Sequence, residues 1–100
     1  MAEALEVTTF RLADGRTGAD FVAANEDINA YLKRQHGFRW RRITEHEDGT
    51  IVDVVAWESV SDAEASARGI MTEMGDSPVH GTIDQSTVDF RILSVLQHTT

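Results

Sequence analysis

A turn signal between two β-rich runs constrains the fold of this chain more than any other feature of its sequence. Asp48-Gly49 separates residues 38–46 from residues 50–58, and both runs are rich in β-branched and aromatic residues. An Asp-Gly pair between two such runs is typical of a tight β-hairpin. The sequence therefore predicts two adjacent antiparallel strands in the middle of the chain.

Extended and helical patterns alternate along the rest of the chain. Residues 3–12 are rich in Val, Thr and Phe, which predicts a strand, and apolar residues then recur every three or four positions over 18–35, which predicts a helix. A second helix is expected over 61–74, and a last strand over 86–97, with an irregular segment between them. This β-α-β-β-α-β order predicts the α+β class and a ferredoxin-like fold, in which two helices cover one face of a four-stranded antiparallel sheet.

Helix start signals support these boundaries. Thr17 or Asp20 can cap the first helix, and Ser61 with Glu64 has the spacing of a capping box at the start of the second helix. Gly37 supplies the residue with a positive φ angle that commonly follows a helix.

Length and composition limit the classes of protein that remain. With 100 residues the chain is expected to form a single domain over 1–100. The formal net charge of −8 argues against nucleic acid and anionic membranes as partners. The absence of cysteine excludes thiolate metal sites and disulfides. Residues 1–6 have neither the basic nor the apolar run of a signal peptide, so a cytoplasmic location is expected.

The register of the hairpin decides which side chains share a face. A two-residue turn at Asp48-Gly49 pairs Trp40 with Trp57, whereas a three-residue turn slips the register by one and places the two tryptophans on opposite faces. We favour the two-residue turn, because it separates aliphatic from aromatic and polar side chains. The aliphatic face then contains Ile43, Val52, Val54 and Ala56, and is expected beneath the helices.

The other face of the hairpin then gathers aromatic and polar residues. It contains Phe38, Trp40, Arg42, Thr44, His46, Ile51, Asp53, Val55 and Trp57. Large apolar side chains on a face without helices need to be covered, so we expect a homodimer joined through these sheet faces. The same residues suit either a lined cavity or an ordinary protein interface.

The chain resembles the dimeric α+β barrel superfamily that includes the antibiotic biosynthesis monooxygenases. The resemblance rests on the order of elements, on Gly37-Phe38 at the start of the second strand, on the Asp48-Gly49 hairpin, and on the run 54–59 followed by Asp62-Ala63. Within the superfamily the chain is most similar to small bacterial proteins without an assigned reaction. The resemblance implies a homodimer with facing sheets and, in each subunit, a ligand pocket between sheet and helices.

The resemblance also implies candidate pocket residues. Cofactor-independent monooxygenases of the group carry an Asn and a Trp four residues apart on the third strand, both directed into the pocket. Asp53 and Trp57 have this spacing here, with Asp in place of Asn. An ionised Asp only accepts hydrogen bonds, so it stabilises an oxyanion only when it is protonated.

Asp53 is the candidate catalytic residue, because aspartate is uncommon inside strands and unfavourable to bury without a partner. It could act as a general base that removes a phenolic or enolic proton, with Arg42 or Trp57 positioning the anion. Alternatively, Asp53 and Arg42 form a structural ion pair in the dimer interface.

Histidine spacing predicts no metal site. The chain has His36, His46, His80 and His98, and no two of them share a helical face. His80 is expected near the pocket mouth and is the histidine that could carry a proton. The candidate ligand pocket therefore consists of Trp40, Arg42, Asp53, Trp57 and His80, with no metal and no cofactor.

Two hypotheses on function remain open at this point. In the first, the barrel binds an apolar or aromatic small molecule and has a cofactor-independent monooxygenase-like activity. In the second, side chains fill the barrel, and the protein has a structural or interaction role. An open pocket above about 300 Å³ would favour the first hypothesis.

Overall fold

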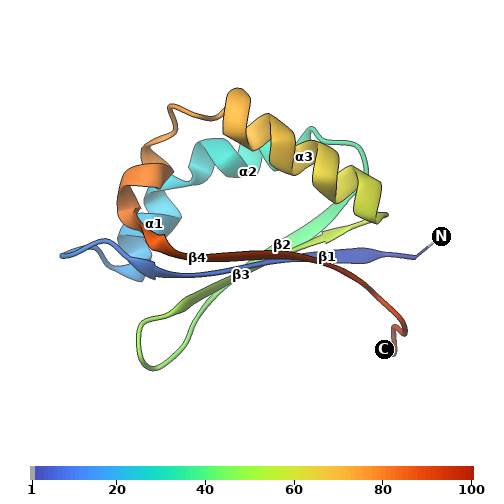
Figure 1. The fold of residues 1–100 in the computed structure, drawn as a ribbon, viewed down its shortest axis with the longest axis horizontal. Coiled ribbons are helices and arrows are strands. Elements are labelled where there is room, and N and C mark those ends of the chain that lie inside the picture. Colours follow the sequence, from blue (N-terminus) through green and yellow to red (C-terminus); the bar gives the residue numbers. More distant parts are fainter. Residues whose placement is uncertain (1) are drawn as a thin grey trace.

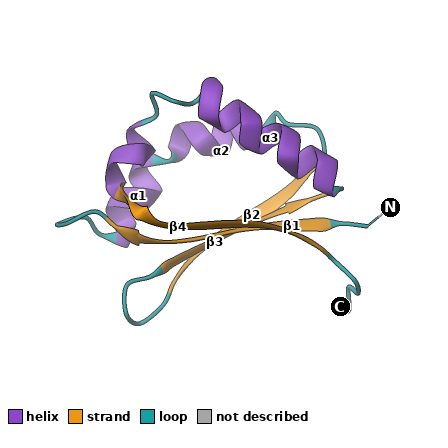
Figure 2. Ribbon diagram, in the orientation of Figure 1, coloured by secondary structure: helices purple, strands orange, loops and turns teal. Residues whose placement is uncertain are grey.

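The helices and the sheet form two layers. The computed structural model describes residues 2–100, with strands β1 (Ala4–Leu12), β2 (Phe38–Glu45), β3 (Ile51–Trp57) and β4 (Ile83–Ser94) and helices α1 (Gly18–Ala24), α2 (Glu26–Lys33) and α3 (Val60–Thr72). The strands form an antiparallel sheet in the order β2-β3-β1-β4. All three helices lie on the same side of this sheet (Figures 1 and 2). The predicted α+β, ferredoxin-like fold is therefore confirmed. Among residues 2–100, no helix has the length and apolar character needed to cross a membrane.

The predicted first helix is divided in two at Asn25. The side-chain amide of Asn25 donates hydrogen bonds to the carbonyl oxygens of Phe21 (3.2 Å) and Val22 (2.6 Å). These bonds give partners to carbonyl groups at the end of α1, where the backbone leaves helical geometry. Asn25 is fully buried. Thr17 caps α1 and forms a capping box with Asp20, as expected.

The second helix and the last strand begin earlier than predicted. The cap of α3 is Ser59, whose hydroxyl accepts from the Asp62 amide, instead of Ser61. The sequence contains two overlapping patterns of this kind, and the structure uses the first. The irregular segment holds a short 3₁₀ helix, Pro78–Thr82, which leads directly into β4 at Ile83.

The favoured register of the hairpin is wrong. Trp40 lies opposite Ala56, and the chain turns between His46 and Thr50 through three residues that end in Gly49, with φ of 91°. A bulge between Phe38 and Trp40 then shifts the pairing again and brings Phe38 opposite Trp57. Trp40 and Trp57 therefore lie on opposite faces of the sheet.

The slipped register also reverses the two faces of β3. Ile51, Asp53, Val55 and Trp57 are buried beneath the helices, where Phe10, Phe21, Tyr31 and Leu32 complete the core. Val52, Val54 and Ala56 lie on the face without helices, contrary to the prediction, and only Ile43 of the predicted aliphatic set packs against the core. A one-residue slip has this effect because side chains alternate along a strand.

Candidate functional site

A cavity of about 570 Å³ lies between the sheet and the helices. The strands contribute most of its polar lining and part of its apolar lining, α1, α2 and α3 add apolar side chains, and the 3₁₀ helix adds one residue of each kind. Its apolar lining residues are Phe10, Phe21, Ile28, Leu32, Val55, Ala67, Ile70, Met71, Val79, Ile83, Val88 and Phe90. Its polar lining residues are Glu6, Thr8, Arg41, Asp53, His80 and Gln85. A few polar groups in a mostly apolar cavity are typical of a small-molecule site.

Glu6, the third residue of β1, is the acid of this cavity whose pKa is shifted. Its side chain is buried, and Oε1 accepts a hydrogen bond of 3.0 Å from the indole Nε1 of Trp57. Burial raises the pKa of Glu6 to about 7; the Trp57 hydrogen bond and the charge of Arg41 oppose the rise, whereas the charge of Asp53 adds to it. A carboxyl group with such a pKa is half protonated near neutral pH and can both accept and return a proton.

Arg41 and Asp53 form a buried, bidentate ion pair beside Glu6. Arg41 Nε donates to Asp53 Oδ1 at 3.0 Å and Nη2 donates to Oδ2 at 2.6 Å. Each side chain exposes only about a tenth of its surface. The third nitrogen, Nη1, donates to the side-chain oxygens of Asn25 and Asn29. A guanidinium has five N–H hydrogens, so one hydrogen on Nη2 has no partner among residues 2–100.

The predicted partner of Asp53 is therefore corrected from Arg42 to Arg41. Arg42 lies on the opposite face of β2, where its guanidinium stacks on the Trp40 ring at 4.4 Å from the ring centre. The prediction followed the two-residue turn, and the three-residue turn exchanges the neighbouring arginines between the faces.

The five predicted pocket residues lie in three different places. Asp53 and His80 line the cavity. Trp57 is fully buried and contacts the site through its hydrogen bond to Glu6, while its ring packs edge-on against Phe38. Trp40 and Arg42 lie on the sheet face without helices.

His80 is held at the cavity wall by the backbone. Its Nε2 donates to the carbonyl oxygen of Met74 at 2.9 Å, so the neutral ring carries its proton on this nitrogen. This contact links the 3₁₀ helix to the residues after α3.

Sequence reasoning missed Glu6 and Arg41. Glu6 stands between the apolar residues Leu5 and Val7, as in a strand whose apolar residues face the core and whose polar residues face solvent. This alternation predicts that the Glu6 side chain is solvated. The available signal was topological: β1 is a central strand in this fold, and residues at alternating positions of a central strand lie beneath the helices.

Comparison with known proteins supports the fold. No protein-family model matches the chain, and no curated protein is significantly similar to it. SnoaB, a cofactor-independent oxygenase from Streptomyces nogalater, is 16% identical, with a TM-score of 0.74 over 98% of this chain and 97% of its own. The monooxygenase from the gene ActVA-Orf6 of Streptomyces coelicolor, in complex with nanaomycin D, is 16% identical, with a TM-score of 0.75 over 99% of this chain and 92% of its own.

A protein described as dimeric and ferredoxin-like shares the same architecture. A dimeric ferredoxin-like protein from an uncultured marine organism is 13% identical, with a TM-score of 0.74 over 100% of this chain and 93% of its own. The predicted resemblance to antibiotic biosynthesis monooxygenase-like, dimeric α+β barrel proteins is thus confirmed for the fold. At these identities the similarity shows the fold alone.

Proposed function

We propose that this protein binds an aromatic or otherwise apolar small molecule bearing an acidic hydroxyl or enol, and that Glu6 accepts the proton of that group. The observation that carries the proposal is a buried carboxyl group inside an apolar cavity of about 570 Å³. This volume is well above the roughly 300 Å³ at the lower end of small-molecule sites. It favours ligand binding over a barrel filled with side chains.

The pKa of Glu6 suits this role. A proton acceptor is most effective when its pKa approaches that of the group it deprotonates, and phenols ionise near pH 10. The rise of the Glu6 pKa from 4.5 to about 7 brings the carboxylate closer to a phenol without protonating it fully at neutral pH.

The ion pair beside Glu6 supplies the second chemical requirement, stabilisation of the resulting anion. Both oxygens of Asp53 accept hydrogen bonds from Arg41, so we assign Asp53 the positioning of Arg41. The remaining Nη2 hydrogen of Arg41 can donate to a ligand oxygen as negative charge develops there.

A cofactor-independent oxygenation is the reaction class that this arrangement suits. SnoaB, of the same fold, is a cofactor-independent oxygenase. Loss of the enol hydroxyl proton, or of a ring CH2 proton from the keto tautomer, gives the same enolate, and the electron-rich ring carbon of this anion reacts directly with O2. A carbon–oxygen bond forms, one oxygen atom remains as a carbonyl, and the other leaves as water with the two hydrogens.

Filling the cavity tests ligand binding. We expect Ala67→Phe, which adds a ring to the cavity lining from α3, to weaken the binding of 1-naphthol at least about tenfold, because the ligand and the new side chain compete for one space. Ala65→Phe, at an exposed position of the same helix, is the control and should bind like the wild type. Fluorescence titration measures both affinities. Equal binding by the Ala67 and Ala65 variants would contradict the proposal.

We also propose that the chain is a homodimer joined through the sheet face without helices. Its apolar residues include Leu5, Val7, Trp40, Val52, Val54, Ala56 and Leu93. Trp40 exposes 37% of its surface and Leu93 47%. A second copy of the same face would cover such a surface, and a protein of the same fold is dimeric.

Light scattering at micromolar concentration tests the dimer. We expect about 22 kDa, twice the 11.1 kDa of one chain. Trp40→Glu should lower the mass toward the monomer, because it buries a charge in the interface. Val22→Glu, at an exposed position of α1, should leave the mass unchanged. A wild-type protein that remains monomeric would rule out this assembly.

A further inference from the structure

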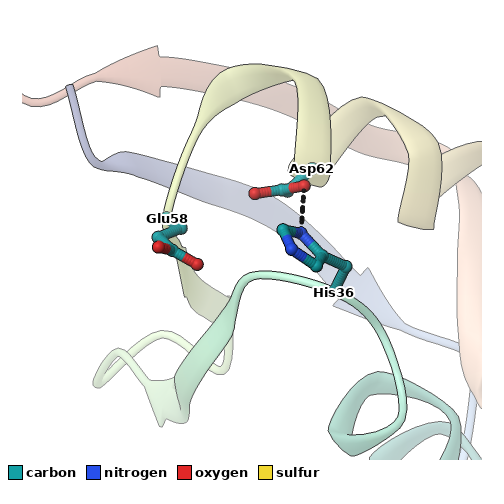
Figure 3. Close-up of side chains that lie close together, drawn as sticks. All are labelled: His36, Glu58 and Asp62. Atoms are coloured by element: carbon teal, nitrogen blue, oxygen red, sulfur yellow. Dashed lines mark hydrogen bonds and ion pairs between the residues drawn. The ribbon is translucent and has the colours of Figure 1, made fainter. Parts of the chain in front are cut away.

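Three potential metal ligands from separate segments meet outside the cavity, near the first turn of α3. They are His36 from the loop before β2, Glu58 just after β3, and Asp62 in α3 (Figure 3). One ligand atom from each residue lies within 4.8 Å of the others. His36 Nδ1 and Asp62 Oδ1 are 2.9 Å apart.

We propose that His36, Glu58 and Asp62 bind a divalent first-row transition-metal ion, with Zn²⁺ as the representative ion. One imidazole nitrogen and two carboxylate oxygens are ligands that Zn²⁺ accepts, and the remaining positions would be filled by water. The imidazole argues against Mg²⁺ and Ca²⁺, which prefer oxygen ligands. A distance of 2.9 Å between the nitrogen and the oxygen is compatible with two adjacent ligands of one ion, whose bonds are each about 2.0 to 2.2 Å.

The surroundings of Asp62 hold its carboxylate in place for this role. Ser59 Oγ donates to Oδ2 at 2.9 Å, so Oδ1 is directed to His36. Groups that orient a ligand in this way tune metal affinity. Gly37 permits the close approach of the loop, because a Cβ atom at this position would collide with the Asp62 carboxylate.

The chain offers a matched control for this site. His46 also lies beside a carboxylate, with Nδ1 3.2 Å from Asp48 Oδ1, and its side chain is exposed like that of His36. His36 belongs to a three-residue group of potential ligands, and His46 is absent from any such group found among residues 2–100. A histidine–carboxylate pair alone is therefore distinguishable from the three-ligand site.

Calorimetric titration of the untagged protein with ZnCl₂ at pH 7.5 tests the proposal. We expect one Zn²⁺ per chain, with affinity reduced at least about tenfold by His36→Ala and by Glu58→Gln, and unchanged by His46→Ala. Glu58→Gln keeps the His36–Asp62 pair and removes only the third ligand. An excess of Mg²⁺ should not displace the zinc.

Three results would overturn the proposal. The first is the absence of binding up to millimolar zinc. The second is an equal loss of affinity in the His46 and His36 variants, which would indicate nonspecific histidine binding. The third is full affinity in Glu58→Gln. Because no cavity residue takes part, none of these results bears on the proposed ligand site.

Discussion

Replacing Asp53 by Asn is expected to lower the free energy of unfolding by about 3 to 5 kcal/mol. The substitution leaves the Arg41 guanidinium buried without the carboxylate that it pairs with, and its side-chain partners are then neutral amides. Removal of one member of a buried ion pair is more destabilising than removal of both, because an uncompensated charge remains in a poorly solvated place. Urea unfolding at one fixed protein concentration measures the change.

A double-mutant cycle identifies the partner. Arg41→Met combined with Asp53→Asn should recover part of the loss, because the second change removes the stranded charge. Arg42→Met is the matched control from the neighbouring position of β2. It removes a stacking contact with Trp40 and should change the free energy of unfolding by about 1 kcal/mol or less. Recovery of stability with Arg42→Met, or strict additivity with Arg41→Met, would contradict the ion pair described above.

Glu6→Gln is expected to alter how stability depends on pH. The folded-state pKa of Glu6, about 7, lies above its ordinary value of 4.5, so the folded protein holds this proton more tightly than the unfolded chain. The resulting stabilisation is complete below about pH 4.5 and is lost as the pH rises through 7. Its full size is about 3 kcal/mol. The variant keeps a hydrogen-bond acceptor for Trp57 but has no proton to lose.

The quantity to measure is the difference in free energy of unfolding between the wild type and Glu6→Gln. From pH 5 to pH 8, the wild type should lose up to about 3 kcal/mol of stability relative to Glu6→Gln. Glu45→Gln, at an exposed end of β2, should follow the wild type at both pH values. Parallel pH profiles for wild type and Glu6→Gln would show that the pKa of Glu6 is not raised.

The architecture could be predicted because each element carries its own local signal. The Asp48-Gly49 turn, the helical periodicity over 18–35 and the apolar strand patterns are all short-range features. Their order alone restricts the topology to few alternatives, since connections are short.

The register could not be predicted, because it depends on the backbone conformation of one residue. Gly49 has a positive φ in either turn, whereas a two-residue type I′ turn also requires a positive φ at Asp48, and within residues 2–100 only glycines have one. This single difference determines whether Arg41 or Arg42 points to Asp53. The predicted partner of Asp53 therefore depended on the length of the turn, which the local sequence does not determine.

The break at Asn25 and the role of Glu6 depend on contacts between distant segments. Asn25 ends α1 and also accepts a hydrogen bond from Arg41, which is 16 positions away. Glu6 and Trp57 are 51 positions apart. A pattern within one helix or strand includes only one residue of each pair. The two residues come together only when the sheet and the helices have assembled.

Proton exchange at a carbon acid tests the proposed role of Glu6 most directly. In oxygen-free D₂O, a base in the cavity should remove a ring CH2 proton of anthrone and return a deuteron, and ¹H NMR follows the loss of the signal. We predict that the wild-type protein accelerates this exchange over buffer, and that Glu6→Gln lowers the protein-dependent rate at least about a hundredfold. An exchange rate equal to that of buffer, or an equal rate in the variant, would contradict the account.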